Sequence, residues 1–521
     1  MSGTFAIDAH RPPGQLSNRH LPMRNLSKSR LLAHRQCPKR LWLELNHPEL
    51  AEISAATQLA FDFGHDVGAI ARRLYDPAGT GVLIDAQRDG FGAAFAQSRE
   101  LLASSRPIFE AGFVANGALA FADVLLPETR NDQRAWRMIE VKSSTALKDV
   151  HRDDVAIQAH IARSAGVPLT AVALAHIDSS WTYAGDGDFS GLLVERELTR
   201  EAFARDDEVH TWIESAQRTA AETSEPDVRT GAQCTSPYVC GFLAHCQGQE
   251  PQPEHPASWL PHPTKKLKAR IARLPVADMR EVPDKLLSRQ QLRVKEQTLS
   301  GTVYFDAEGA AKDLAPYALP ALFLDFETIQ FAVPRWRGTR PYAQIPFQFS
   351  VQRLAADGTL TETGFIDLSG NDPTEPIARA LIAACGEHEP VFTWNAGFER
   401  ARISELAVRV EELSAPLLAI NERIVDLLPI AKERYYHPSQ QGSWSIKRVL
   451  PAIAPDLSYG DLDGVNHGTE AIGAYLEAVH PKASAGRKTE IERELRAYCA
   501  LDTVAMVRLW RFLKGETIAD S

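Results

Sequence analysis

Alternating apolar and polar residues in the first half of the chain predict paired strands. Residues 119–126 and 136–143 alternate in this way, and the polar stretch between them favours a turn, so together they predict a β-hairpin. Side chains alternate across a strand, so Glu140 and Lys142 should share one face while their apolar neighbours point into a core. Asp123 should project from the neighbouring strand. A helical stretch then carries Gln158.

A second periodic block follows in the last third of the chain. Residues 322–328 form an apolar strand that is interrupted by Asp325 and Glu327, which should share a face. Carboxylates in so apolar a strand are costly unless they are paired or bind a metal. Residues 390–394 predict another buried strand, and the helix after it begins near Glu399, where a carboxylate also suits the helix dipole.

The last predicted helix, residues 489–513, carries an apolar stripe on one side. Tyr498 and Asp502 lie one turn apart on it, so their side chains face the same way. Four carboxylates and a tyrosine thus follow one another along this block, in the order Asp325, Glu327, Glu399, Tyr498 and Asp502.

Alternating strands and helices over 521 residues predict an α/β protein of several domains. A proline-rich stretch, residues 249–264, marks a boundary. The predicted order is a disordered tail (1–25), a first domain (26–248), a helical linker (249–319) and a second domain (320–515). No apolar run is long enough to cross a membrane, and the N-terminus lacks the apolar core of a signal peptide, so we expect a cytoplasmic protein with no membrane partner.

The formal net charge of −10 gives no support to nucleic-acid binding by the chain as a whole. It does not exclude a nuclease, because a nuclease must gather carboxylates to hold metal ions. Local basic stretches occur at residues 265–273 and 335–340, although each alone is typical of a solvated surface.

Four of the six cysteines form a pattern. Cys234, Cys240 and Cys246 are evenly spaced, and Cys37 stands alone near the other end of the first domain. Five-residue gaps suit closely spaced zinc pairs poorly and favour a 4Fe–4S cluster, with zinc or four ordinary buried thiols as the alternatives. Cys385 and Cys499 lie in apolar helical patterns and should be core residues.

The first domain resembles the PD-(D/E)XK nucleases of the RecB-like iron–sulfur type, which include the CRISPR-associated iron–sulfur exonucleases and the AddB nuclease domain. The residues that carry the resemblance are Cys37, Asp123, Glu140, Lys142, Gln158, Cys234, Cys240 and Cys246. It implies that Asp123 and Glu140 bind Mg²⁺ or Mn²⁺, that Lys142 positions or activates the attacking water, that Gln158 is the motif glutamine and that the four cysteines hold the cluster. His65 and Glu110 are further candidates, with a surface histidine and a helix-end carboxylate as the plainer interpretations.

The second domain resembles the DEDD 3′–5′ exonucleases, which have an RNase H-like fold, in the subtype with tyrosine in the third motif. LDFET, WNAGFE and YCALD correspond to the three motifs, and Asp426 and Lys447 stand in the intervening segment. The resemblance implies that Asp325, Glu327 and Asp502 hold two metal ions, that Glu399 completes the ligand shell of the outer metal and that Tyr498 orients the water. The family normally has aspartate where this chain has Glu399.

Taken together, the two resemblances predict a metal-dependent exonuclease acting on DNA, on single strands or ends, in repair or defence. Such a fusion resembles an uncharacterised bacterial family. Two alternatives stay open. One is a nucleic-acid-binding scaffold with one or both sites inactive, and the other is an exonuclease that trims RNA.

Overall fold

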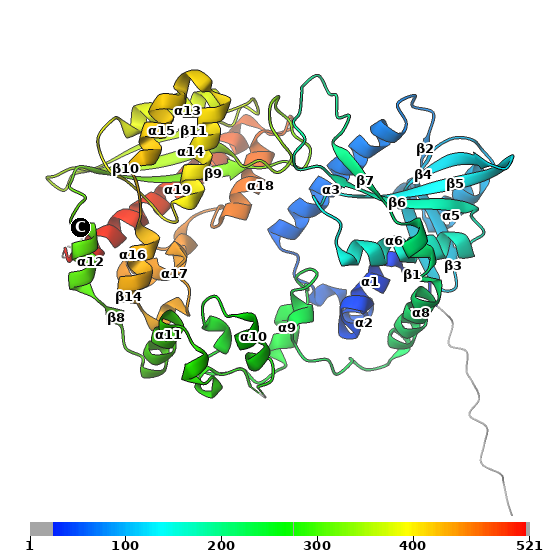
Figure 1. The fold of residues 1–521 in the computed structure, drawn as a ribbon, viewed down its shortest axis with the longest axis horizontal. Helices are drawn as coiled ribbons and strands as arrows, with labels where there is room; N and C mark the ends of the chain where they lie inside the picture. Colours follow the sequence, from blue (N-terminus) through cyan, green and yellow to red (C-terminus); the bar gives the residue numbers. More distant parts are fainter. Residues whose placement is uncertain (1–23, 275, 517–521) are drawn as a thin grey trace, which may run out of the picture.

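The computed structural model describes residues 24–274 and 276–516, which form a mixed α/β molecule with one main sheet in each half of the chain (Figure 1). The α/β prediction is therefore confirmed. Nearly all of the predicted tail, residues 1–23, lies outside the described residues. In Figure 1 the N-terminal half lies on the right, the C-terminal half on the left, and the chain between them runs along the bottom. No helix in the described ranges is long and apolar enough to span a membrane.

The first sheet is mixed, in the order β2-β3-β4-β5-β6-β7, with β1 beside β4. β3, β4 and β5 are antiparallel, whereas β5 and β6 are parallel and are joined across α6. The predicted hairpin is β4–β5, and Asn131 and Asp132 both have positive φ in its two-residue turn, as a type I′ turn requires. The strands are β1 (Leu26–Ser27), β2 (Val82–Leu83), β3 (Ile108–Ala115), β4 (Ala118–Arg130), β5 (Gln133–Lys142), β6 (Leu169–Ile177) and β7 (Leu193–Glu197).

Helices cover both faces of this sheet. Trp136 and Met138 face a core built with α1, α5, α6 and α8, whereas Ile139 faces the side covered by α3. Glu140, in phase with Met138, therefore points towards α6. The helices of this half are α1 (Lys28–Gln36), α2 (Pro38–Asn46), α3 (Ala55–Tyr75), α4 (Ala86–Asp89), α5 (Phe91–Leu101), α6 (Asp149–Ser164), α7 (Thr199–Phe203), α8 (Asp206–Ala221) and α9 (Leu243–Gly248).

The segment predicted as a helical linker contains three helices, α10 (Lys265–Ile271), α11 (Arg289–Ser300) and α12 (Ala307–Leu314). Their apolar residues are buried in one core with the C-terminal half, to which Val294, Ala310 and Leu314 contribute. Strand β8 (Tyr304–Phe305) from the same segment pairs with β14 (Tyr435–Tyr436). Most of this connector is thus part of the C-terminal core.

The second sheet has the order β11-β10-β9-β12-β13. The first three strands in this order are antiparallel, and β9, β12 and β13 are parallel. On β9, Leu322, Leu324 and Phe326 face helices α13 to α15, while Phe323 faces α19. The strands are β9 (Ala321–Ile329), β10 (Ile345–Leu354), β11 (Leu360–Ile366), β12 (Val391–Thr393) and β13 (Ile424–Asp426).

The long predicted helix is α19, which crosses the sheet and contacts both β9 and β10. It is longer than its apolar stripe predicted. The helices of the C-terminal half are α13 (Thr374–Cys385), α14 (Gly397–Arg409), α15 (Ser414–Glu422), α16 (Leu427–Arg434), α17 (Ile446–Ile453), α18 (Gly468–Ala478) and α19 (Ala485–Lys514).

The two halves touch through an apolar cluster formed by α3, the end of β6 and the segment after β9. Phe63 and Val67 on α3 pack near Ala332, and Tyr342 donates a hydrogen bond to the carbonyl of Ser143. Helix α3 also contacts α18, at the top centre of Figure 1. The two sheets are therefore held together by packing as well as by the connector.

Candidate metal centres

Three carboxylates converge where α19 crosses the second sheet. Asp325 and Glu327 come from β9 and Asp502 from α19, and one oxygen of each lies within 4.8 Å of the others. Asp325 and Glu327 share the β9 face that α19 covers because they are in phase with Phe323. The structure thus brings together three of the four carboxylates predicted for this site.

Burial raises the pKa values of all three carboxyl groups, and repulsion by neighbouring carboxylates adds to the shifts of Asp325 and Glu327. Burial raises the pKa of Glu327 to about 8 and that of Asp502 to about 6, and the charge of Asp502 adds to the shift of Glu327. The pKa of Asp325 is raised by burial and then by its charged neighbours. A divalent cation would relieve this repulsion, since it favours the ionised forms.

Tyr498 lies beside the three carboxylates and is held there by Lys447. The Lys447 ammonium donates to the Tyr498 hydroxyl at 2.9 Å and lies over the rings of Tyr498 and Tyr459. Tyr459 donates to Asp502 at 2.5 Å. Burial and the charge of Asp502 raise the pKa of Tyr498, which keeps its hydroxyl protonated.

Glu399 is buried at the start of α14 but does not belong to the group of three. Burial raises its pKa to about 8, and its Oε2 atom makes no hydrogen bond. Its charge contributes to the raised pKa of Asp325, so the two lie near each other. Asp426 instead caps α16 through the Leu428 amide at 3.0 Å and also accepts from the Asn395 amide.

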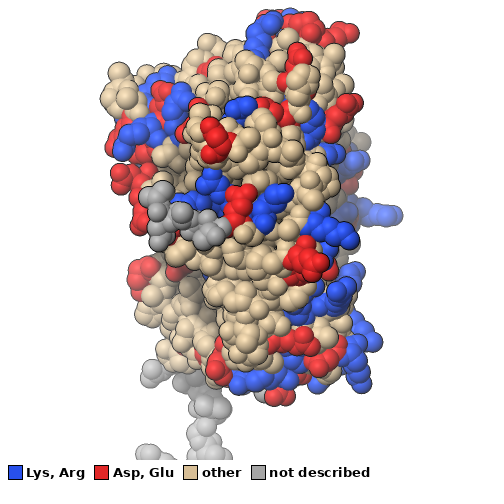
Figure 2. Space-filling model, turned by 90° about the vertical axis from the view of Figure 1, so that its left-hand side faces the viewer, with Lys and Arg blue, Asp and Glu red and all other residues tan. Residues whose placement is uncertain are grey.

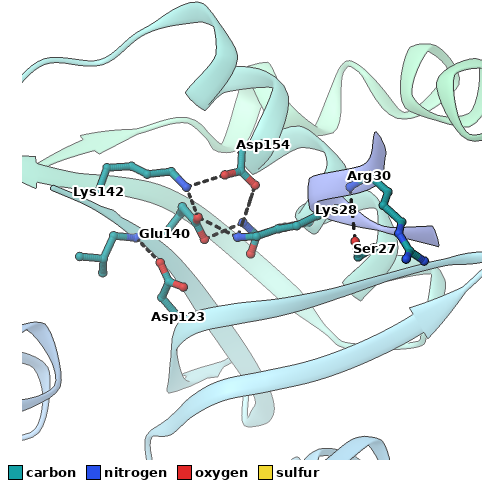
Figure 3. A network of polar contacts seen from close by, with 9 residues as sticks. Ser27, Lys28, Arg30, Asp123, Glu140, Lys142 and Asp154 are labelled. Atoms are coloured by element: carbon teal, nitrogen blue, oxygen red, sulfur yellow. Dashed lines mark hydrogen bonds and ion pairs between the residues drawn. The ribbon is translucent and has the colours of Figure 1, made fainter. Parts of the chain in front are cut away.

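A second polar cluster lies on the first sheet, between β5 and α6 (Figure 3). Glu140 accepts from Lys142 at 2.5 Å and from Gln158 at 2.5 Å. Asp123 accepts from the Val141 amide at 2.7 Å, and burial and then the charge of Glu140 raise its pKa. The structure therefore brings all four predicted residues of this site together.

Two further members of this cluster were not predicted. Lys28 pairs with Glu140 at 2.8 Å and with Asp154 at 3.5 Å, and Asp154 also pairs with Lys142 at 2.5 Å. Asp154 lies four residues before Gln158 and accepts a hydrogen bond from the Gln158 side-chain amide at 2.9 Å. That i,i+4 spacing was a usable signal, whereas Lys28 lies 112 residues from its partner and offered none.

Glu110 lies within strand β3, so the helix-end interpretation was wrong. It has a positive φ of 55°, an unfavourable conformation for a residue other than glycine, opposite the stretch of β4 that carries Asp123. Burial raises its pKa, and the positive charges of Lys28 and His65 oppose that shift. His65 is exposed on α3. Both residues therefore lie at the edge of the polar cluster.

All four patterned cysteines line one small cavity. Cys37 lies at the junction of α1 and α2, and Cys240 donates its amide to the Cys234 carbonyl at 2.8 Å. Cys385 and Cys499 are buried, which confirms that prediction, and the Cys499 thiol lies 3.9 Å from Asp325 Oδ2. The cavity therefore lies where the beginning and the end of the N-terminal half come together.

The cysteine sulfurs are less tightly grouped than the four ligands of one tetrahedral ion would be. Tetrahedral zinc with Zn–S bonds of about 2.3 Å requires sulfurs about 3.8 Å apart. Among the described residues, no three cysteine sulfurs lie within 4.8 Å of one another. A four-iron cluster is larger than one ion and spreads its thiolate ligands further apart.

Comparison with known families gives one match. Residues 322–445 match a family model described as a domain of unknown function, DUF2779. The matched segment contains Asp325, Glu327 and Glu399 and ends before Tyr498 and Asp502. No curated protein matches the chain.

Proposed function

We propose that the chain is a divalent-metal-dependent nuclease that hydrolyses phosphodiester bonds of DNA, with a 3′–5′ exonuclease site in its C-terminal half. The observation that carries the proposal is the convergence of Asp325, Glu327 and Asp502. Glu327 and Asp502 are buried and Asp325 is half-buried. All three carry oxygen ligands of the kind that Mg²⁺ and Mn²⁺ prefer, and they come from segments about 175 residues apart in the sequence.

Bound cations would polarise the phosphate and make a metal-bound water acidic. Asp325, Glu327 and Asp502 would hold them, with Glu399 at the outer edge. The protonated hydroxyl of Tyr498 would orient the water, and Lys447 would fix the tyrosine ring. Tyr459 would fix the orientation of the Asp502 carboxylate.

Strand order supports an RNase H-like fold for the C-terminal half. Its sheet runs third, second, first, fourth, fifth in chain order, with Asp325 and Glu327 on the central first strand. The N-terminal half, with its D…E-x-K residues on an antiparallel pair and a crossover helix to a parallel strand, suits the PD-(D/E)XK fold. We propose both folds on these grounds.

The first polar cluster is proposed as a second metal site, and the four cysteines as ligands of a structural 4Fe–4S cluster. Glu140 already makes ion pairs with two lysines. This pairing favours the alternative, for the N-terminal half alone, that it binds nucleic acid without cutting it. RNA as substrate is the remaining alternative.

The test uses 5′-labelled single-stranded DNA with Mn²⁺. We expect Asp325→Asn to slow shortening from the 3′ end by more than about 100-fold, because it removes a metal ligand. Asp357→Asn is the matched control, since Asp357 lies in an exposed turn. Equal degradation by wild type and an Asp325→Asn, Lys142→Ala double variant would refute the proposal, and an RNA strand of the same sequence tests the choice of polymer.

A further inference from the structure

A cavity of about 820 Å³ lies where the two halves of the molecule meet. Its wall comes from the segment after β6, from residues 338–346, which lead into the start of β10, and from one side of α14. Its volume lies within the range of ligand pockets, about 300–1,000 Å³. None of the described residues that line it is a proposed metal ligand, so the two metal centres do not account for it.

The charges around this cavity are mostly positive. The described lining residues include Arg340, Arg402 and Arg409 but a single carboxylate, Glu405. Arg409 forms an ion pair with Asp372 at 2.6 Å. The other two arginines, Arg340 and Arg402, therefore share a single exposed carboxylate, that of Glu405. By contrast, the outer face of the C-terminal half, shown in Figure 2, carries acidic and basic side chains interspersed. The cavity therefore presents a mostly positive wall to an anion.

Arg402 is the strongest indication of a ligand. Its side chain is 8% exposed, yet its ion-pair partner is Glu405, which is 46% exposed. It also donates to Gln344, while its Nε atom is buried without an acceptor. A buried guanidinium with an unfilled donor is costly, and a phosphate oxygen would supply the missing acceptor.

The cavity adjoins the metal centre of the C-terminal half. Gln330 lines it and directly follows the end of β9, three residues, or about 10 Å, beyond Glu327. Arg402 lies one turn beyond Glu399 on α14, and its positive charge lowers the pKa of Glu399 against the larger effect of burial. A group bound at Arg402 would therefore lie close to the site of cleavage.

The same cavity also reaches the N-terminal half. Ser179, Ser180 and Thr182 contribute hydroxyl groups to its wall. Tyr342, another lining residue, donates to the carbonyl of Ser143, which directly follows Lys142. The wall thus contains residues of both halves, and one of them, Tyr342, is hydrogen-bonded to the residue after Lys142.

We propose that this cavity binds the sugar–phosphate backbone of a single DNA strand whose 3′ end lies at Asp325 and Asp502. Arg402 and Arg340 would bind phosphates, and the serine and threonine hydroxyls would bind phosphate or sugar oxygens. The identity of the strand rests on the nuclease function proposed above. The binding itself does not, because it needs no metal and no cleavage.

The experiment measures the binding of a fluorescein-labelled oligothymidylate to the full chain by anisotropy in EDTA. We expect Arg340→Gln and Arg402→Gln each to weaken binding by about 10-fold. Each should also reduce the slope of log affinity against log salt by about 0.7, as for one lost phosphate contact. Circular dichroism checks that each variant folds, and Arg340, being exposed, is the safer position.

Arg353→Gln is the matched control, because Arg353 is an exposed arginine at the opposite end of β10 and should bind as wild type does. The cavity proposal is wrong if wild type does not bind the strand, or if Arg340→Gln binds it as tightly as Arg353→Gln. Loss of binding in the two variants, combined with no cleavage under any metal, would leave the cavity proposal standing and refute the nuclease function.

Discussion

Glu327 is a buried acid whose folded-state pKa is about 8, well above its ordinary value. A group with a raised folded pKa holds a proton that the unfolded chain releases, so its contribution to stability declines as pH rises from about 4.5 towards 8. Without metal, the carboxylate site should therefore destabilise the folded chain at alkaline pH. Bound metal should reverse this effect, since the ligands must ionise to bind it.

Replacing this acid by its neutral amide tests that conclusion. In EDTA we expect Glu327→Gln to be more stable than wild type by roughly 2–4 kcal/mol above pH 8, with the gap growing from about pH 4.5. Chemical denaturation at several pH values measures it. Mn²⁺ should stabilise wild type but not the variant. Glu362→Gln, an exposed change on β11, should follow wild type, and a gap that does not depend on pH would contradict the assignment.

Lys28 occupies a place in the first cluster that a cation could take. We expect Lys28→Met to lower the free energy of unfolding by about 2–4 kcal/mol, because Glu140 and Asp154 lose one of their two ammonium partners. Mn²⁺ should restore part of this loss, as measured by thermal unfolding with and without the metal. Lys266→Met, at an exposed position, is the control. Equal protection of wild type and Lys28→Met by Mn²⁺ would show that no cation replaces the lysine.

Alternation along single strands predicted the faces of Glu140, Lys142, Asp325 and Glu327, because the two-residue period of a strand is a local property. Lys28 and Tyr459 were missed because their roles depend on partners 112 and 43 residues away. Glu110 was misread because a strand residue with positive φ has no sequence signature. Local pattern thus predicted the strand-borne carboxylates, whereas the residues that hold them in place required the tertiary structure.

At the scale of elements, the sequence predicted that the linker is helical but not which part of the molecule its helices pack against. The short helices α10 to α12 were recognised as helical, yet their apolar residues lie in the C-terminal core. A short amphipathic helix reveals which face is apolar but not what covers that face. The boundary between halves therefore lies in the proline-rich stretch before α10.

The cysteine cavity ties together elements from the two ends of the N-terminal half. Cys37 lies between α1 and α2, and Cys246 lies on α9. If the four thiols hold a cluster, anaerobically purified protein should be brown and contain about four iron atoms per chain. The Cys37→Ser variant should lose the brown colour and the iron, and it should unfold at a lower temperature, because metal binding is coupled to folding.

Cys385→Ser is the control for this prediction, since Cys385 is buried in the other half of the molecule. It should keep the colour and the iron whatever it does to stability. Colourless protein from anaerobic cells, or stoichiometric zinc in place of iron, would contradict the cluster.

At the scale of the whole molecule, the apolar contact between the halves keeps the two sheets in one arrangement. We expect Ala332→Glu to separate them, because it puts a charge against Phe63 and Val67. Unfolding should then split into two transitions, and residues 249–264 should be cut faster by protease. Ala356→Glu, in an exposed turn, is the control. A single unchanged transition in Ala332→Glu would mean that the contact contributes little.

Helix α19 has a practical consequence for anyone who trims this protein. The segment that matches the family model stops at residue 445, about 40 residues before α19 begins. A fragment cut to that match would keep Asp325 and Glu327 but lose Asp502, and it would expose the face of β9 and β10 that α19 covers. Such a fragment should be insoluble and inert, and a usable one would have to extend at least to Leu513.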